Sequence, residues 1–176
     1  RDFAVQVLGP GRGRRCLVVG SPIFEAQALA DLGLDITFVD VREPPGFPGL
    51  VCLADVMRLP FADACFDALS TTCVLCHVGL GRYGDPVAER GDERAIREMA
   101  RVLKPGAHAA VMFGPCLGGL AQTVVLGTTH RVYRFQDAYD LAGQAGLRML
   151  GASVWCDGRW LGAGEPEMHA ARFAAK

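Results

Sequence analysis

Short apolar runs alternate with segments of helical periodicity along most of the chain, and this alternation limits the possible folds most strongly. Runs such as 15–20 are apolar throughout, which is typical of a strand buried on both faces of a parallel sheet. Segments such as 92–103 instead place Ile96, Met99 and Leu103 on one helical face. The expected strands are 15–20, 35–40, 49–54, 67–72, 107–113, 149–155 and 168–173, and the expected helices are 25–32, 92–103 and 136–144.

This order predicts an α/β fold with a doubly wound, mostly parallel, seven-stranded sheet. We expect the last strand, 168–173, to be an antiparallel edge strand. Without an internal repeat or a low-complexity linker, residues 1–176 are interpreted as a single domain, and 1–14 as the remnant of an N-terminal segment. Such sheets bind ligands at the carboxyl ends of their strands, so functional residues are expected there.

Composition excludes several classes of function. A formal net charge of −1 gives no long-range attraction for nucleic acid, so we expect no nucleic-acid partner. The longest apolar runs are too short to cross a bilayer, and no apolar signal segment follows Arg1, so we predict a cytoplasmic protein without membrane association. Seven cysteines, mostly in apolar segments, are expected to be reduced and buried.

Acidic residues follow three consecutive predicted strands: Glu25, Asp40 and Asp55. Asp40 comes about 20 residues after Gly20, the interval at which a carboxylate meets ribose hydroxyls in nucleotide-binding α/β units. Asp55 is placed to accept a hydrogen bond from an adenine amino group, with Val41 and Met57 against the ring faces. The alternative for each acidic residue is a surface cap.

The turn after the first strand argues against a dinucleotide. Binding a pyrophosphate there requires a glycine-rich turn with free amides, but Gly20 is followed by Ser21, Pro22 and, at the helix start, Glu25. Proline removes one amide donor, and the carboxylate would repel a phosphate. A ligand without phosphate and with a positive charge is compatible with this turn.

Five segments carry a resemblance to a known family: 16–21, 38–40, 54–61, 66–70 and 101–106. Taken together, they resemble the class I S-adenosylmethionine-dependent methyltransferases, and the resemblance extends over most of the chain from Arg15 onward. The most specific of them is 101–106, which precedes a predicted strand. Segments 79–85 and 130–133 further resemble a little-characterised branch of that superfamily, although the family's usual G-x-G-x-G turn is absent.

The resemblance implies a Rossmann-like methyltransferase fold, S-adenosylmethionine as cofactor, and site residues by position. Gly20 and Ser21 would line the methionine moiety, Asp40 would hold the ribose and Asp55 the adenine. The predicted cofactor-binding residues are Gly20, Ser21, Asp40, Val41, Asp55, Val56, Met57, Thr72 and Cys73.

The segment Cys73-Val-Leu-Cys76-His77 matches the haem attachment pattern and also offers zinc ligands. Haem attachment needs an export signal, and the sequence shows none. The segment also directly follows an apolar strand, which a covalently attached haem would disrupt. We therefore predict no metal, and interpret the cysteines as packing thiols at the first turn of a helix.

His77, Asp85, His130 and Tyr133 are the predicted catalytic residues, each able to act as a base toward a hydroxyl acceptor. For His77 the alternative is a structural histidine, and the long loop around Asp85 is a candidate lid. The predicted function is methyl transfer to a small molecule, with a sugar or another hydroxylated metabolite as acceptor. The alternatives are a noncatalytic domain of the same fold and a nicotinamide-dependent oxidoreductase.

Overall fold

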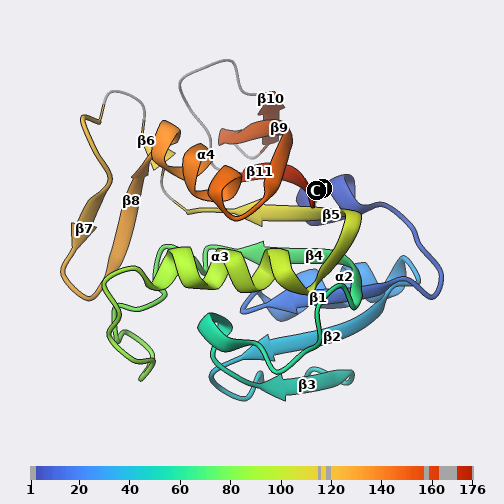
Figure 1. Ribbon diagram of the computed structural model, residues 1–176. Coiled ribbons are helices and arrows are strands. Elements are labelled where there is room, and N and C mark those ends of the chain that lie inside the picture. The colour runs from blue at the N-terminus through green and yellow to red at the C-terminus, as the bar shows by residue number, and fades with distance from the viewer. Residues whose placement is uncertain (1–2, 115, 118–119, 157–158, 163–169, 176) are drawn as a thin grey trace.

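The computed structural model describes residues 3–114, 116–117, 120–156, 159–162 and 170–175 (Figure 1). Eight of its strands form one sheet, in the order β10-β9-β11-β5-β4-β1-β2-β3. β1 pairs in parallel with β2 and β4, and the chain runs outward from this centre in both directions. The strands of this sheet are β1 (Arg15–Val19), β2 (Asp35–Asp40), β3 (Leu50–Leu53), β4 (Phe66–Thr72), β5 (Leu103–Met112), β9 (Leu147–Cys156), β10 (Arg159–Gly162) and β11 (Ala170–Ala175).

Helices cover both faces of this sheet, as expected for doubly wound topology. The helices are α1 (Phe3–Leu8), α2 (Ile23–Asp31), α3 (Gly91–Val102) and α4 (Phe135–Gln144), with a 3₁₀ turn η1 (Val56–Arg58) after β3. Leu29 of α2 and Phe3 of α1 pack with Phe38 in one core cluster, whereas Met99 of α3 and Ala138 of α4 belong to the other. Figure 1 shows α3 and α4 in front of the sheet and α2 behind it.

The predicted α/β class and mostly parallel sheet are confirmed, with two differences at the far edge. The antiparallel strand β11 is not at the edge, because it pairs with β5 on one side and β9 on the other. The sheet also has an eighth strand, because Arg159–Gly162 folds back on β9 as β10. Met168, where we expected the last strand to begin, lies outside the described residues.

A smaller sheet lies beside the main one and was not predicted. It consists of β6 (Cys116–Leu117), β7 (Val124–Leu126) and β8 (His130–Arg134), in the order β6-β8-β7. Figure 1 shows the β7–β8 hairpin extending at one side of the molecule. The Arg131 amide donates to the carbonyl of Cys76 at 2.7 Å, which ties this hairpin to the segment after β4.

The segment after β4 does not form the expected helix. Residues 75–83 are consecutive turns, with the His77 amide donating to the Val74 carbonyl at 2.8 Å. Gly79 has φ +74°, and a Cβ there would lie 2.6 Å from the Ala88 carbonyl oxygen. A helix cannot continue through that conformation, so the chain turns away and forms a loop.

Helices long and apolar enough to cross a membrane are absent from the described part of the chain.

Candidate functional site

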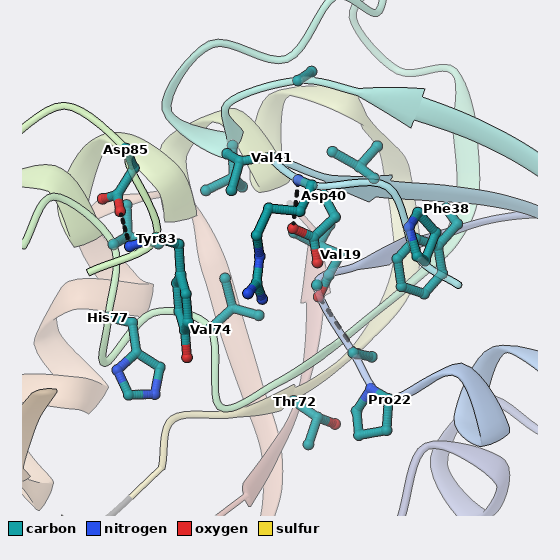
Figure 2. Close-up of a pocket in the computed structure, with 18 of the residues that line it drawn as sticks. Val19, Pro22, Phe38, Asp40, Val41, Thr72, Val74, His77, Tyr83 and Asp85 are labelled. Carbon is teal, nitrogen blue, oxygen red and sulfur yellow. Dashed lines mark hydrogen bonds between the residues drawn. The ribbon is translucent and has the colours of Figure 1, made fainter. Parts of the chain in front are cut away.

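A cavity of about 740 Å³ opens at the carboxyl ends of β1, β2 and β4. Figure 2 shows Asp85, Tyr83 and His77 on one side of it, Pro22 and Phe38 on the other. The sequence analysis predicted the candidate residues at this edge of the sheet. The volume of the cavity is within the range of small-molecule sites.

Gly20 directly follows β1 and lines the cavity, at a position that requires a residue without a side chain. Its φ of +55° is a left-handed conformation, and a Cβ there would lie 2.7 Å from Cγ2 of Val74. Its amide donates to the Val39 carbonyl at 2.8 Å, which fixes the turn against β2. The backbone of Gly20 therefore borders the cavity directly, as its predicted role requires.

Asp40 and Asp55 both line the cavity, and each forms the same local turn. One carboxylate oxygen of Asp40 accepts from the Arg42 amide at 3.0 Å, and one of Asp55 accepts from the Met57 amide at 2.8 Å. These bonds orient both side chains. The second oxygen of each has no hydrogen-bond partner within the described part of the chain, so each carboxylate retains an acceptor for a ligand.

Most of the predicted cofactor residues are brought together here. Those that line the cavity are Gly20, Ser21, Asp40, Val41, Asp55, Val56, Thr72 and Cys73. Met57 does not line it, because its side chain packs against the hydrophobic core instead. Val56 takes the place next to Asp55 that we expected Met57 to fill.

Glu25, the third acidic residue in the sequence pattern, does not line the cavity. It is buried, and its carboxylate accepts from the hydroxyls of Ser70 and Thr72, each at 2.7 Å. Thr72 lines the cavity, so Glu25 fixes a residue of the cavity wall without lining the cavity itself.

The cysteines of the Cys73–His77 segment point in different directions. Cys73 lines the cavity with φ +56°, whereas the Cys76 thiol is buried and donates to the Cys73 carbonyl at 3.2 Å. Burial, together with the nearby charge of Glu25, raises the pKa of Cys73 and disfavours a thiolate. Within the described ranges, no group of three or more histidine, cysteine, aspartate or glutamate side chains is arranged to hold a metal ion.

His77 lines the cavity, and one of its ring nitrogens is engaged. Nδ1 lies 2.7 Å from the carbonyl oxygen of Thr129, in the β7–β8 turn. A carbonyl only accepts, so a neutral His77 carries its proton on Nδ1 and leaves Nε2 as an acceptor. Burial lowers the pKa of His77, with smaller lowering contributions from Arg82 and His130; the Thr129 bond and Asp85 act in the opposite direction. The lowered pKa favours the neutral imidazole.

Tyr83 and Arg42 form the cavity wall beside His77. The Tyr83 ring lies 5.6 Å from the His77 ring, edge to face, and the Arg42 guanidinium lies 4.3 Å from the Tyr83 centroid. Asp85 holds the loop in place, because its two carboxylate oxygens accept from the amides of Gly79 and Tyr83. With both oxygens engaged in this way, Asp85 is placed to shape the loop more than to accept a proton.

His130 and Tyr133 do not line the cavity. The His130 ring lies 6.3 Å from the His77 ring. Tyr133 is buried, with its hydroxyl 2.9 Å from a carboxylate oxygen of Asp92 and 3.1 Å from the Leu75 carbonyl. Burial raises the pKa of Tyr133 well above its ordinary value, so the phenol keeps its proton and cannot accept one from an acceptor.

Arg131 is a site-supporting residue that the sequence did not single out. It is buried, and its guanidinium donates to the carbonyls of Leu75 and Val78 and lies 3.5 Å from Asp92. The sequence could have indicated Arg131, because it lies between the candidate residues His130 and Tyr133. It could also have indicated Arg42, a positively charged residue two positions after Asp40.

A doubly wound sheet with a cavity at its carboxyl edge, lined by a glycine turn and two oriented carboxylates, defines a Rossmann-like fold. Residues 19–111 match the family model described as the methyltransferase domain. Since that match covers more than half of the chain, the protein belongs to the methyltransferase-domain family, within the class I S-adenosylmethionine-dependent methyltransferases. Membership implies S-adenosylmethionine as cofactor.

Individual proteins show the same similarity. The ubiquinone/menaquinone biosynthesis C-methyltransferase UbiE of Bdellovibrio bacteriovorus is 32% identical over 124 residues, which cover 68% of this chain and 37% of that protein. The chain thus spans little more than a third of that relative's length.

Two solved structures share the fold. The 1,6-didemethyltoxoflavin-N1-methyltransferase of Burkholderia thailandensis, solved with S-adenosylhomocysteine, has a TM-score of 0.71 and 15% identity, covering 98% of this chain and 75% of that one. The [4+2]-cyclase SpnF has a TM-score of 0.67 and 22% identity, covering 84% and 56%. At these identities the likeness concerns the fold alone.

Proposed function

We propose that this protein transfers a methyl group from S-adenosylmethionine to a hydroxyl group of a small molecule, such as a sugar or another hydroxylated metabolite. The observation that supports it best is the position of His77, which lines the same cavity as Asp40 and Asp55 and whose Nδ1 is bonded to Thr129, so that Nε2 is left as the acceptor. The proposed base and the proposed cofactor-binding carboxylates therefore line one cavity.

The residues present suit S-adenosylmethionine. The unpaired oxygens of Asp40 and Asp55 would accept from the ribose hydroxyls and the adenine amino group, with Val41 and Val56 against the ring. Gly20 and Ser21 would border the methionine moiety. When bound, the cofactor supplies a methyl group made electrophilic by its positively charged sulfur.

The proposed task of the protein is mainly to hold and align the acceptor, because transfer of an activated methyl group depends strongly on proximity. His77 would accept the hydroxyl proton of the acceptor at Nε2 while Nδ1 stays bonded to Thr129. Tyr83 offers an aromatic face beside that position.

The test is production of S-adenosylhomocysteine from S-adenosylmethionine in the presence of a panel of acceptors. The panel should hold sugars and phenolic compounds, and also quinol precursors, since the name of the UbiE relative places it in quinone biosynthesis. Turnover with a hydroxylated compound that is lost in His77→Gln supports the proposal. Methylation only at carbon or nitrogen, unaffected by His77→Gln, contradicts the proposed acceptor.

A further inference from the structure

A buried polar network joins the β7–β8 hairpin to the turns that carry His77. Arg131 of β8 donates from Nη1 to the Leu75 carbonyl at 3.2 Å and to the Val78 carbonyl at 2.6 Å, one residue on either side of Cys76 and His77. Its Nε lies 3.5 Å from an Asp92 carboxylate oxygen on α3, and its side chain is only 5% exposed. One side chain thus fixes three separate segments.

Tyr133 strengthens the same network from two residues further along β8. Its hydroxyl lies within hydrogen-bond distance of both Asp92 and the Leu75 carbonyl. The backbone contributes as well, through the bond from the Arg131 amide to the Cys76 carbonyl at 2.7 Å. A network buried and satisfied to this degree holds a single arrangement, because breaking any member leaves a buried polar group unpaired.

The consequence for His77 comes from the other end of β8. Thr129 precedes the strand in the hairpin turn, and its carbonyl accepts from His77 Nδ1 at 2.7 Å and from Arg82 at 3.2 Å. The hairpin that carries Thr129 is anchored to the turns around His77 by the Arg131 side chain, together with the Arg131 amide and the Tyr133 hydroxyl. The atom that decides which ring nitrogen carries the proton therefore depends on a residue that does not line the cavity.

We infer that Arg131 is a positioning residue, which holds the Thr129 carbonyl on Nδ1 and so keeps His77 as the Nδ1–H tautomer with Nε2 free to accept a proton from the acceptor. This rests on the proposed function of His77 as the base. It assigns a role to the 130–133 segment that differs from the predicted one: His130 and Tyr133 were expected to act on the acceptor, whereas this segment sets the state of His77.

The test reads the tautomer directly, by long-range ¹H–¹⁵N correlation spectra of the protein labelled with ¹⁵N-histidine, without cofactor or acceptor. His77→Gln assigns the signal. The wild-type protein should show the Nδ1–H pattern for His77, and Arg131→Met should lose it in favour of Nε2–H or of a mixture. Arg82→Ala is the matched control, because it removes the other donor to Thr129 without releasing the hairpin, and should keep the wild-type pattern.

An Nε2–H pattern in the wild type would overturn the inference, as would an unchanged pattern in Arg131→Met. Where the methionine variant fails to fold, Arg131→Lys replaces it, because a lysine keeps the charge beside Asp92 but cannot bond both carbonyls in the same way. A wild-type pattern in a folded Arg131→Lys would overturn the inference as well. Since no ligand is present, the outcome is independent of whether the protein methylates anything.

Discussion

Replacing Gly20 should affect both stability and cofactor binding, because two independent constraints apply at this position. Its backbone is left-handed, and any Cβ would meet Val74 at 2.7 Å. Gly20→Ala should lower the free energy of unfolding by about 1–3 kcal/mol and weaken cofactor binding. Urea denaturation measures the first effect, and titration with S-adenosylhomocysteine the second.

The matched control is Gly143→Ala in α4, where a Cβ would meet nothing within 4 Å. Alanine is the better helix former, so this variant should gain up to about 1 kcal/mol. Equal stability of the two variants would show that the β1 turn is not constrained as described.

The ionisation of His77 should make turnover depend on pH. Burial holds its pKa below the ordinary 6.5, and a base acts only when neutral. Turnover should therefore be constant near pH 7 and fall as pH decreases through a value below 6.5. His77→Gln should lower turnover roughly 10²- to 10⁴-fold and remove this dependence, with cofactor affinity unchanged. A rate profile still governed by an ionisation in that range in His77→Gln would assign the base elsewhere.

Among the elements, α3 connects two segments that are far apart in the sequence, 55–61 and 101–106. Arg101, near its end, donates to the carbonyls of Leu59 and Phe61 and pairs with Asp63. Glu98 accepts from the Leu59 amide at 2.8 Å. Glu98 and Arg101 of α3 therefore clamp the 55–61 segment, which carries Asp55.

Arg101→Ala should lower the free energy of unfolding by about 1–2 kcal/mol, allowing for its partial exposure, because two carbonyls lose a charged donor. Arg101→Lys should restore little, since one ammonium cannot serve all these acceptors. On the same helix, Arg97→Ala removes only an exposed pair with Glu93 and should stay within about 0.5 kcal/mol. Chemical denaturation of the three variants would decide; a loss in Arg97→Ala as large as that in Arg101→Ala would refute the clamp.

The success of sequence reasoning differed between elements for physical reasons. β2 was predicted with its observed bounds, Asp35–Asp40, because an apolar run that ends in a charged residue is a local signal. The small sheet was missed because β7 and β8 depend on contacts made far away in the sequence, such as Arg131 with Val78. The expected helix at Cys76 was wrong, although the sequence contained a signal against it, the closely spaced glycines Gly79, Gly81 and Gly84. In the structure all three have positive φ.

At the scale of the whole molecule, topology explains why Asp40 and Asp55 could be predicted and Glu25 could not. The carboxyl ends of β1 to β4 meet at one edge, so residues just after them converge there whatever their neighbours are. Glu25 lies further along, inside α2, where the direction of a side chain depends on helix rotation and packing. Its partners Ser70 and Thr72 are on β4, and nothing local in the sequence predicts that contact.

The central claim is that the cavity at this edge is the cofactor site. Isothermal titration with S-adenosylmethionine and S-adenosylhomocysteine tests it most directly, using Asp40→Ala and Asp55→Ala, with Asp35→Ala at the opposite end of β2 as control. We predict one site per chain, an affinity reduced several-fold to a hundredfold in the first two variants through the loss of one buried hydrogen bond, and wild-type affinity in the control. Absence of binding at millimolar ligand, or equal affinity in all the variants, would contradict it.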